Sequence, residues 1–386
     1  MTEKKLKICA VTTTRADYGI MRPLLLKLDG CDWCDLVLAV TGTHLLKAFG
    51  HTIDEVKKDG LKIDKKISIM SKANDSPVET ANIMSKTVLK FTEYFEKSKP
   101  DVVLLLGDRF ETFEVAASCT ICRIPVIHIA GGETTEGAVD EVFRHSITKM
   151  SYLHLASTEA YKDRVIQLGE DPKRVYNTGA LGVENVMNVK TLSKEELGKS
   201  LDFKLDKPYA VVTFHPVTLE NNSAVAQLHE LLKVLHAHTE MKFIITKANA
   251  DLSGEKINAE LEEFVKSNPH CIVVSSLGTL KYFSAIKGSC MVIGNSSSGI
   301  VEVPSFGKPT INIGDRQKGR IQANSTINCK PTEADIEKAL KKALKFNKEV
   351  INPYGDGKTS DKMVKIIKKT FYGKDIDLKK VFYDLK

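Results

Sequence analysis

Long hydrophobic runs are missing from this sequence of 386 residues. A typical apolar run, Val102–Leu106, reads VVLLL, far short of the roughly 20 apolar residues that a membrane-spanning helix needs. The start of the chain also lacks the apolar core of a signal peptide, because the short stretch 6–11 is followed by Thr12-Thr13-Thr14-Arg15. We therefore expect a protein that does not enter a membrane, and we place it in the cytoplasm.

Signatures of common cofactors are absent as well. No G-x-G-x-x-G follows the first apolar run, which argues against a nicotinamide cofactor, and no spacing of His, Cys and Asp matches a metal site. The eight cysteines include two C-x-x-C pairs, Cys31 with Cys34 and Cys119 with Cys122. A zinc or redox site is one interpretation, but both pairs lie in or beside apolar runs, where thiols act as small hydrophobic side chains. We expect no metal, no cofactor and reduced structural thiols.

A strong excess of charge of one sign is also lacking. The 56 Lys and Arg residues against 49 Asp and Glu give a net charge of +7, which is mild beside the clustered charge of nucleic-acid-binding proteins. The most basic stretch, 358–386, interleaves its lysines with Met363, Ile367 and Phe371 at helical spacing. This pattern indicates a solvated helix face rather than a nucleic-acid or membrane surface, and an anionic small molecule fits the charge balance equally well.

Short apolar runs alternate with amphipathic segments along the chain, which is typical of parallel α/β folds. At about 150 residues per domain the length suggests two to three domains, and a polar, lysine-rich segment at 188–206 separates two series of apolar runs. We predict two Rossmann-like domains with a cleft between them, residues 1–190 and 191–365. The predicted strands are 6–11, 35–40, 102–106, 125–129, 152–156, 209–214, 242–246, 271–274, 291–293 and 310–313. The predicted helices are 22–28, 44–58, 78–97, 111–122, 139–149, 159–168, 224–238, 255–267, 280–287 and 300–305.

Ligands of open parallel sheets bind beyond the carboxyl ends of the strands. The residues that follow the predicted strands are mostly charged or polar, as such a binding edge requires. They are Arg15, Asp17, Asp108, Arg109, Glu133, His215, Asn249 and the run Asn295 to Ser298.

A serine-rich turn, Gly294–Gly299, lies between an apolar run and a predicted helix. Amide groups and hydroxyls at a helix N-terminus form a cradle for phosphate. Helix capping by Ser297 or Ser298 is the alternative, although capping needs only one serine. Glu302, one turn into the helix, either reaches a pair of ribose hydroxyls or complements the helix dipole. His215 ends an apolar run, and we expect its ring to face a ligand.

Three acidic residues are the candidate proton-transfer groups. Asp108 precedes Arg109 at a strand end, where capping of the next helix is equally compatible with the pattern. Glu133 follows two glycines, which indicates a tight turn that brings the backbone close to a ligand. Asp140 lies one turn before Arg144, and the alternative for these two is an ion pair on a solvated helix face.

Taken together, several separated motifs resemble those of the hydrolysing UDP-N-acetylglucosamine 2-epimerases. The resemblance covers nearly the whole chain and is strongest to the bacterial sialic-acid and legionaminic-acid branch. In chain order the motifs are Thr14-Arg15-Ala16-Asp17-Tyr18-Gly19, Gly107-Asp108-Arg109, Gly131-Gly132-Glu133, Asp140-x-x-x-Arg144-His145, Gly294-Asn295-Ser296-Ser297 with Glu302, and Asn352-Pro353-Tyr354-Gly355-Asp356-Gly357.

The resemblance implies a fold of glycosyltransferase-B type, with a last helix at about 366–386 that crosses back to the first domain. It implies elimination of UDP from UDP-N-acetylglucosamine to give 2-acetamidoglucal, and hydration of this glycal to N-acetylmannosamine. The implied partner is a UDP-sugar, and the implied assembly is a homodimer or homotetramer. The catalytic residues would be Asp108, Glu133, Asp140 and His215, and the substrate-binding residues Arg15, Arg109, Arg144, Asn249, Ser296, Ser297, Glu302 and Arg316.

One position departs from the family pattern. Relatives usually have glutamate at the third position of H-x-E, whereas His128 is followed here by Ile129 and Ala130. Either Glu133 replaces the lost carboxylate or the chemistry is divided differently among the acids. The resemblance also leaves open a GDP-linked or a 2,4-diacetamido sugar as substrate. A glycosyltransferase and a non-catalytic nucleotide-sugar sensor are the alternatives of other classes.

Overall fold

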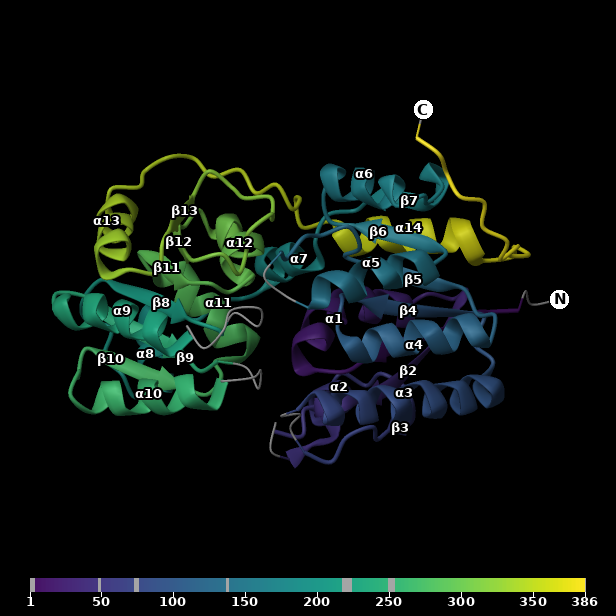
Figure 1. Cartoon of the computed structure of the whole chain (residues 1–386), viewed down its shortest axis with the longest axis horizontal. Coiled ribbons are helices and arrows are strands. Elements are labelled where there is room, and N and C mark those ends of the chain that lie inside the picture. Colours follow the sequence, from purple (N-terminus) through teal and green to yellow (C-terminus); the bar gives the residue numbers. More distant parts are fainter. Residues whose placement is uncertain are drawn as a thin grey trace. The chain divides into compact units, whose positions relative to one another are not determined.

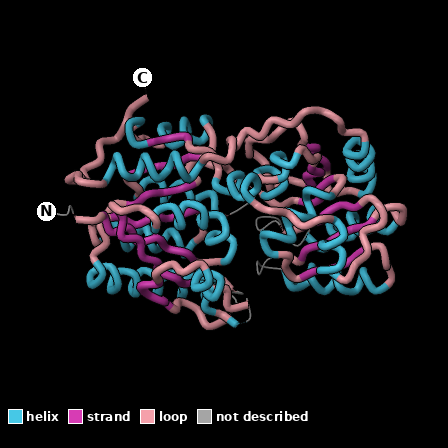
Figure 2. The backbone as a smooth tube through the Cα atoms, turned by 180° about the vertical axis from the view of Figure 1, so that it is seen from behind, coloured by secondary structure: helices cyan, strands magenta, loops and turns pink. Residues whose placement is uncertain are grey.

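The computed structural model describes residues 4–47, 50–72, 76–136, 139–216, 224–248 and 254–385. Backbone contacts divide the chain into two compact units, each built around a parallel sheet (Figures 1 and 2). Unit 1 comprises Met1–Glu133, Asp140–Asn185 and Tyr354–Lys386, and unit 2 comprises Thr134–Val139 and Val186–Pro353. Apart from the short segment Thr134–Val139, the chain leaves unit 1 at 185–186 and returns at 353–354, where we predicted 190–191 and about 365–366. The predicted pair of parallel α/β domains is confirmed.

Unit 1 contains a seven-stranded sheet in the order β3-β2-β1-β4-β5-β6-β7. Alternate residues of a strand face opposite sides, so Ile8 of β1 joins a core layer with α1 and α14, while Cys9 joins a layer with α3 and α4. Its strands are β1 Leu6–Thr12, β2 Cys34–Thr41, β3 Ile63–Ile67, β4 Val102–Leu106, β5 Val126–Ile129, β6 Leu153–Ala156 and β7 Val175–Asn177. Its helices are α1 Arg15–Asp29, η1 Gly42–Leu45, α2 Ile53–Lys58, α3 Pro77–Ser98, α4 Phe110–Ile121, α5 Asp140–Met150, α6 Glu159–Gln167, η3 Pro172–Arg174, α7 Leu181–Asn188 and α14 Thr359–Phe371.

Unit 2 contains a six-stranded sheet in the order β10-β9-β8-β11-β12-β13. Val212 of β8 packs in a layer with α9, α10 and α13, and Val211 packs in the opposite layer with α8 and α11. Its strands are β8 Tyr209–Thr213, β9 Lys242–Thr246, β10 Cys271–Val274, β11 Met291–Gly294, β12 Thr310–Ile313 and β13 Thr326–Cys329. Its helices are α8 Lys194–Leu201, α9 Ala224–Ala237, α10 Gly254–Lys266, α11 Gly278–Gly288, α12 Ser298–Val301, η4 Val303–Phe306 and α13 Glu333–Leu344.

Some elements differ from the sequence prediction. The polar segment 188–206 contains helix α8, which Ser193 and Glu196 begin with a reciprocal capping box. The predicted helix at 44–58 is instead η1 followed by the short α2, because His51 takes a positive φ of 49° between them. The short strands β3, β7 and β13 were missed, since a half-exposed strand of three to five residues has little hydrophobic pattern. Among the described residues no helix is long and apolar enough to cross a membrane.

The C-terminal end of the chain lies against unit 1 beside α6 (Figure 1). The last helix, α14, runs from Thr359 to Phe371, so the predicted helix at about 366–386 begins earlier, and the following residues form an extended tail. Lys380 of this tail donates hydrogen bonds to the carbonyl oxygens of Lys149 (2.9 Å) and Ser151 (2.7 Å) at the end of α5. A cation at a helix C-terminus satisfies carbonyl groups that have no partner within the helix.

Glu170 is the centre of a buried ion cluster that holds this tail. Its side chain is 0% exposed and accepts from Lys149 Nζ (2.7 Å), Lys380 Nζ (2.6 Å) and His154 Nε2 (3.0 Å). Burial by itself would raise the pKa of Glu170, but these three partners outweigh burial and lower the pKa to about 2. Because the folded-state pKa lies below the unfolded value, the carboxylate stabilises the fold above about pH 4.3, and this stabilisation is lost as the pH falls toward 2.

We predict that Glu170→Ala lowers the free energy of unfolding by about 3 kcal/mol. The substitution removes the buried carboxylate that the half-buried Lys149, Lys380 and the buried His154 ring share. Urea denaturation at pH 7 measures the loss, and the difference from the parent should shrink as the pH is lowered from 5. The control is Glu195→Ala, which removes an exposed ion pair with Lys199 and should cost less than about 1 kcal/mol. Equal effects of the two substitutions would contradict the prediction.

Candidate functional site

The predicted acidic residues of unit 1 follow neighbouring strands of its sheet. Asp108 comes after β4, Glu133 after β5, and Asp140 is the first residue of α5, the helix that leads to β6. Because β4, β5 and β6 are adjacent and parallel, their carboxyl ends lie along one edge of the sheet. Open α/β sheets bind their ligands at this edge, beyond the carboxyl ends of the strands.

Arg144 of α5 joins these segments. Its side chain is 1% exposed, and its Nη2 pairs with Asp108 Oδ2. Its Nη1 donates to the backbone oxygen of Glu133 (3.0 Å) and to Glu141 Oε2 (2.6 Å). The alternative of a solvated Asp140–Arg144 pair is therefore wrong, because this guanidinium is buried.

Asp108 does not cap the next helix. Helix α4 begins at Phe110 with Arg109 at its N-cap, so Asp108 lies outside the capping position and pairs with Arg144 instead. Arg109 Nε lies 3.1 Å from Glu111 Oε2. The short segment after β4 thus presents one carboxylate and one guanidinium, each held by an ion pair.

Asp140 has a strongly perturbed acidity. Burial, and then the nearby carboxylate of Asp108, raise the pKa of Asp140 to about 6, against a smaller opposing effect of Arg109 and Arg144. Asp108 has a guanidinium partner at contact distance, whereas Asp140 is the group that burial and like charge push toward neutrality. Two neighbouring carboxyl groups in such different environments are suited to separate acid and base roles at neutral pH.

Glu133 is buried and held by a hydrogen bond from Ser157 Oγ (2.8 Å), at the end of β6. From the sequence, the two preceding glycines are expected to bring the backbone close to a ligand. The structure gives another reason: Gly132 has a φ of +78°, and a Cβ atom there would lie 2.2 Å from the backbone oxygen of Tyr161 in α6. Packing of the chain against itself therefore requires this glycine.

His128 and Ala130 flank the end of β5. His128 Nε2 donates to the Gly107 carbonyl oxygen (2.8 Å), and its Nδ1 lies 3.3 Å from Thr148 Oγ1. Burial lowers the pKa of His128 to about 3. His128 is thus neutral and links β4, β5 and α5. Ala130, where the family pattern has glutamate, adopts a positive φ of 65°, which is uncommon for a residue with a Cβ atom.

Two further polar residues lie at this sheet edge: Asp17, which is outside the predicted set of site residues, and His44, which the sequence pattern does not reveal. Asp17 is at position N3 of α1 and forms a capping box with Thr14, and its carboxylate also accepts from the Thr13 amide (2.9 Å) and the Thr12 hydroxyl. His44 lies 2.9 Å from Thr12 Oγ1. Burial would raise the pKa of Asp17, but the nearby His44 ring and the hydrogen bond from Thr12 hold it below its usual value. The T-x-x-D spacing was the available signal.

Arg15 is the first residue of α1, beyond the carboxyl end of β1. It is half-exposed and its Nε lies 3.0 Å from Glu55 Oε1 of α2. The same sheet edge therefore carries Arg15 as well as the carboxyl groups that follow β4 and β5, because β1 is paired with β4.

In unit 2, Asn295 connects the ends of β8 and β11. Its Oδ1 accepts from the His215 amide (2.7 Å), and its Nδ2 donates to the His215 carbonyl oxygen (2.8 Å). Gly294 makes this junction possible, since a Cβ atom there would lie 1.8 Å from the Thr213 oxygen at a φ of +137°. Burial, and then the charge of Arg316, lower the pKa of His215 to about 3, so its ring is neutral.

The serine-rich turn differs from its prediction. The expected helix at 300–305 is the four-residue α12 followed by η4, so the helix dipole behind the turn is weak, and Glu302 is the C-cap of α12. Ser297 occupies the N-cap position, yet among the described residues its hydroxyl makes no capping hydrogen bond. Ser296 Oγ accepts from the Ser298 amide (3.4 Å). Capping therefore does not explain Ser297.

The end of β12 contributes to the same region. Arg316 Nη1 (3.1 Å) and Gln317 Nε2 (2.9 Å) both donate to the Asn295 carbonyl oxygen. The structure thus brings Arg316 to the turn that contains Ser296 and Ser297, next to His215. The remaining predicted residue, Asn249, lies outside the described residues.

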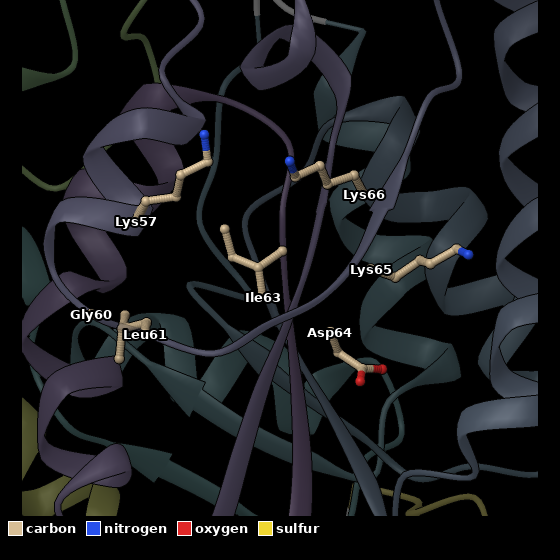
Figure 3. A pocket seen from close by; sticks show the side chains of 7 residues that line it. All are labelled: Lys57, Gly60, Leu61, Ile63, Asp64, Lys65 and Lys66. Atoms are coloured by element: carbon tan, nitrogen blue, oxygen red, sulfur yellow. The ribbon is translucent and has the colours of Figure 1, made fainter.

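A surface pocket of about 600 Å³ lies beside the edge strand β3 (Figure 3). Its lining includes none of the predicted site residues. The residues are Lys57, Gly60, Leu61, Ile63, Asp64, Lys65 and Lys66. Lys57 is paired with Asp54, and Asp64 accepts from Tyr94 (2.7 Å), so the chemistry of this pocket is that of an ordinary charged surface.

Comparison with known proteins agrees with the resemblance seen in the motifs. Residues 27–368 match the family model described as UDP-N-acetylglucosamine 2-epimerase. The chain is 42% identical over 346 residues to a GDP/UDP-N,N'-diacetylbacillosamine 2-epimerase (hydrolyzing) of Campylobacter jejuni, covering 89% of this chain and 90% of that protein. It is 40% identical to the polysialic acid biosynthesis protein P7 of Escherichia coli, covering 98% and 97%.

The fold also matches solved structures. The crystal structure of UDP-GlcNAc 2-epimerase from Neisseria meningitidis bound to UDP-GlcNAc superposes with a TM-score of 0.80 at 18% identity, covering 95% of this chain and 100% of that one. At this identity the likeness establishes the two-sheet architecture.

We predict that Asp108→Asn lowers the pKa of Asp140 from about 6 toward the ordinary range near 4. The substitution removes a neighbouring negative charge and releases Arg144 to interact with Asp140, and both changes favour the ionised form. Carbon-13 labelling of the aspartate carboxyl groups with an NMR pH titration measures the shift, and the Asp140→Asn spectrum assigns the signal. An unchanged titration midpoint would show that Asp108 does not act on Asp140.

Proposed function

The chain belongs to the UDP-N-acetylglucosamine 2-epimerase family, and on this premise we propose that it is a hydrolysing 2-epimerase of nucleotide sugars. The reaction takes a nucleoside-diphospho-2-acetamido sugar and water, and releases the nucleoside diphosphate and the free sugar inverted at C2. The names of the Campylobacter and Escherichia relatives support this activity. The observation in this structure that carries it is the pair Asp108 and Asp140, one held by Arg144 and the other with a pKa of about 6.

The proposed reaction has two steps. In the first, a base removes the proton from C2, the C1–O bond breaks, and the nucleoside diphosphate leaves, which gives a glycal. In the second, water adds its oxygen to C1 of the glycal, and an acid delivers a proton to the opposite face of C2. Both steps need a group that accepts or donates a proton near neutral pH, and a carboxyl group with a pKa of about 6 is well matched to this task.

Unit 1 supplies the proton-transfer groups in this proposal. Asp140 exchanges a proton with the sugar, Asp108 is the second carboxylate, and Glu133 is the third, in place of the glutamate missing at Ala130. Arg144 is buried against Asp108 and the Glu133 backbone, so it acts by holding these groups rather than by reaching the ligand. Arg15 and Arg109 are at the same sheet edge and offer positive charge to the leaving diphosphate.

Unit 2 supplies the nucleotide site. Ser296 and Ser297 belong to the turn after β11, and Arg316 donates to the Asn295 carbonyl oxygen of the same turn. We propose that a diphosphate accepts hydrogen bonds from the two hydroxyls and the guanidinium. His215 is neutral in the folded protein, so we propose that it donates or accepts a hydrogen bond rather than providing charge. Glu302 is proposed to hold the ribose hydroxyls.

Two substrates fit the proposal. UDP-N-acetylglucosamine would yield N-acetylmannosamine, and the name of the Escherichia relative supports a role in sialic acid synthesis. The name of the Campylobacter relative favours a UDP- or GDP-linked 2,4-diacetamido sugar. We further propose a cytoplasmic enzyme that works as a homodimer or homotetramer. Comparing kcat/KM for the two sugars, each with both nucleotides, decides the substrate.

Isotope incorporation tests the mechanism. Incubation with the nucleotide sugar alone, without an acceptor, should release nucleoside diphosphate and the free 2-epimer, which in deuterium oxide should carry about one deuterium at C2. In oxygen-18 water the nucleoside diphosphate should contain no label, because the C1–O bond breaks. Retention of the C2 hydrogen, or oxygen-18 in the diphosphate, would rule out elimination and hydration. Intact substrate in the absence of acceptor would favour the glycosyltransferase, and binding without turnover would favour the sensor.

Substitutions in the two units should affect different quantities, turnover for unit 1 and UDP affinity for unit 2. Asp108→Asn should abolish turnover but leave UDP affinity within about threefold, because only proton-transfer capacity and local charge change. Ser297→Ala should instead weaken UDP binding by about 1 to 3 kcal/mol, the range for a lost hydrogen bond to a charged group. Titration calorimetry and steady-state kinetics measure both effects. Near-native turnover of Asp108→Asn, or unchanged UDP affinity of Ser297→Ala, would contradict the corresponding assignment.

A further inference from the structure

Glu141, the second residue of α5, is not among the residues assigned above. Its two carboxylate oxygens face different partners: Oε2 accepts from Arg144 Nη1 (2.6 Å), and Oε1 lies 3.0 Å from His145 Nε2. Arg144 continues the chain of contacts through its Nη2 to Asp108. The result is a continuous series from His145 through Glu141 and Arg144 to the carboxylate of Asp108.

We propose that Glu141, together with His145, is a positioning element that orients the Arg144 guanidinium toward Asp108 for the reaction proposed above. The effect of Glu141 on catalysis rests on the proposed function. The orientation of Arg144 by Glu141 can be tested without turnover.

The burial of Arg144 separates this arrangement from an ordinary surface pair. Exposed i,i+3 and i,i+4 pairs on a helix contribute little to stability, because solvent screens their charges. Arg144 is only 1% exposed, and the side chains of Glu141 and Asp108 are 24% and 27% exposed. A buried guanidinium needs its donors satisfied, because an unpaired buried charge is costly.

The two ends of the guanidinium are held by different groups. Nη1 is shared between Glu141 and the backbone oxygen of Glu133, and Nη2 faces Asp108. Without the Glu141 carboxylate, Nη1 would lose the charged one of the two acceptors named above. The guanidinium could then rotate or shift toward Asp108 and Asp140, and the relative placement of these acids would change.

His145 supports Glu141 from the other side. A carboxylate beside Nε2 favours the tautomer with a proton on that nitrogen, so the ring donates to Glu141. Its other ring nitrogen, Nδ1, is buried and has no hydrogen-bond partner within the described ranges. Of the two ring nitrogens, Nε2 therefore contacts Glu141 and Nδ1 contacts no hydrogen-bonding group in the part of the chain that the structure describes. We conclude that Glu141 orients the His145 ring.

The first test is the kinetics of Glu141→Gln, which keeps the size of the side chain and removes its charge. We expect kcat to fall roughly 10- to 100-fold, the effect of misplacing reacting groups by a fraction of an ångström, while KM and UDP affinity stay within about threefold. Glu141→Asp should recover part of the loss, and His145→Gln should show a smaller loss of the same kind. The control is Glu159→Gln, which removes an exposed charge paired with Lys162 on α6 and should leave kcat unchanged.

The second test does not depend on turnover. The charged groups acting on Asp140 are Asp108 and Arg109 from the segment after β4 and Arg144 from its own helix. Without the Glu141 charge, the Arg144 guanidinium can interact more strongly with the carboxylate of Asp140. The NMR titration midpoint of Asp140 should therefore move to lower pH in Glu141→Gln. It should not change in the control Glu159→Gln.

The outcomes are distinct. A parent protein without turnover would refute the proposed function but not the orientation of Arg144, which the titration would still report. A fully active parent with an equally active Glu141→Gln variant would overturn the positioning role. An unchanged Asp140 midpoint in that variant would show that Glu141 does not control Arg144, and would overturn the inference on structural grounds.

Discussion

The buried guanidinium of Arg144 is the interaction on which the candidate site depends. It pairs with Asp108 after β4, binds the backbone of Glu133 after β5 and contacts Glu141 in its own helix. Each of these segments follows a different strand or belongs to a different element, so their relative position is not determined by the backbone of any one of them. A single planar cation with five donors can hold three such acceptors at once, which a lysine could not do with the same geometry.

This arrangement also explains why the pKa of Asp140 is raised. Asp108 has the guanidinium at contact distance, while Asp140 is left with burial and a neighbouring negative charge, which raise its pKa to about 6. The different surroundings of Asp108 and Asp140 depend on the position of α5, because this helix contains both Asp140 and Arg144. At its far end the helix is held by Lys149 and by Lys380, both paired with the buried Glu170. Ion pairs thus hold α5, the helix that presents Asp140, at Arg144 in its second turn and at Lys149 near its C-terminal end.

The glycines of the two candidate sites have their reason in the packing of the chain itself. Gly132 and Gly294 both have positive φ values, and at each the place of a Cβ atom is occupied by a backbone oxygen, from Tyr161 and Thr213 respectively. These contacts let a loop turn sharply at the end of a strand, so that Glu133 and Asn295 can follow immediately. The glycine-containing motifs therefore belong to the scaffold that positions the site.

The sequence by itself determined the fold class and the edge of each sheet where polar residues gather, because both follow from local pattern. Apolar runs such as Val102–Leu106 are buried strands, and parallel strands place their following residues on one edge. It also contained the capping box of α8, a local signal that was overlooked. Only the tertiary structure decided that Arg144 is buried, that Asp108 pairs with it rather than capping α4, and that Asp140 is the acid with the raised pKa. These facts depend on desolvation and on charges from residues up to 36 positions apart in the chain, and a one-dimensional pattern contains neither quantity.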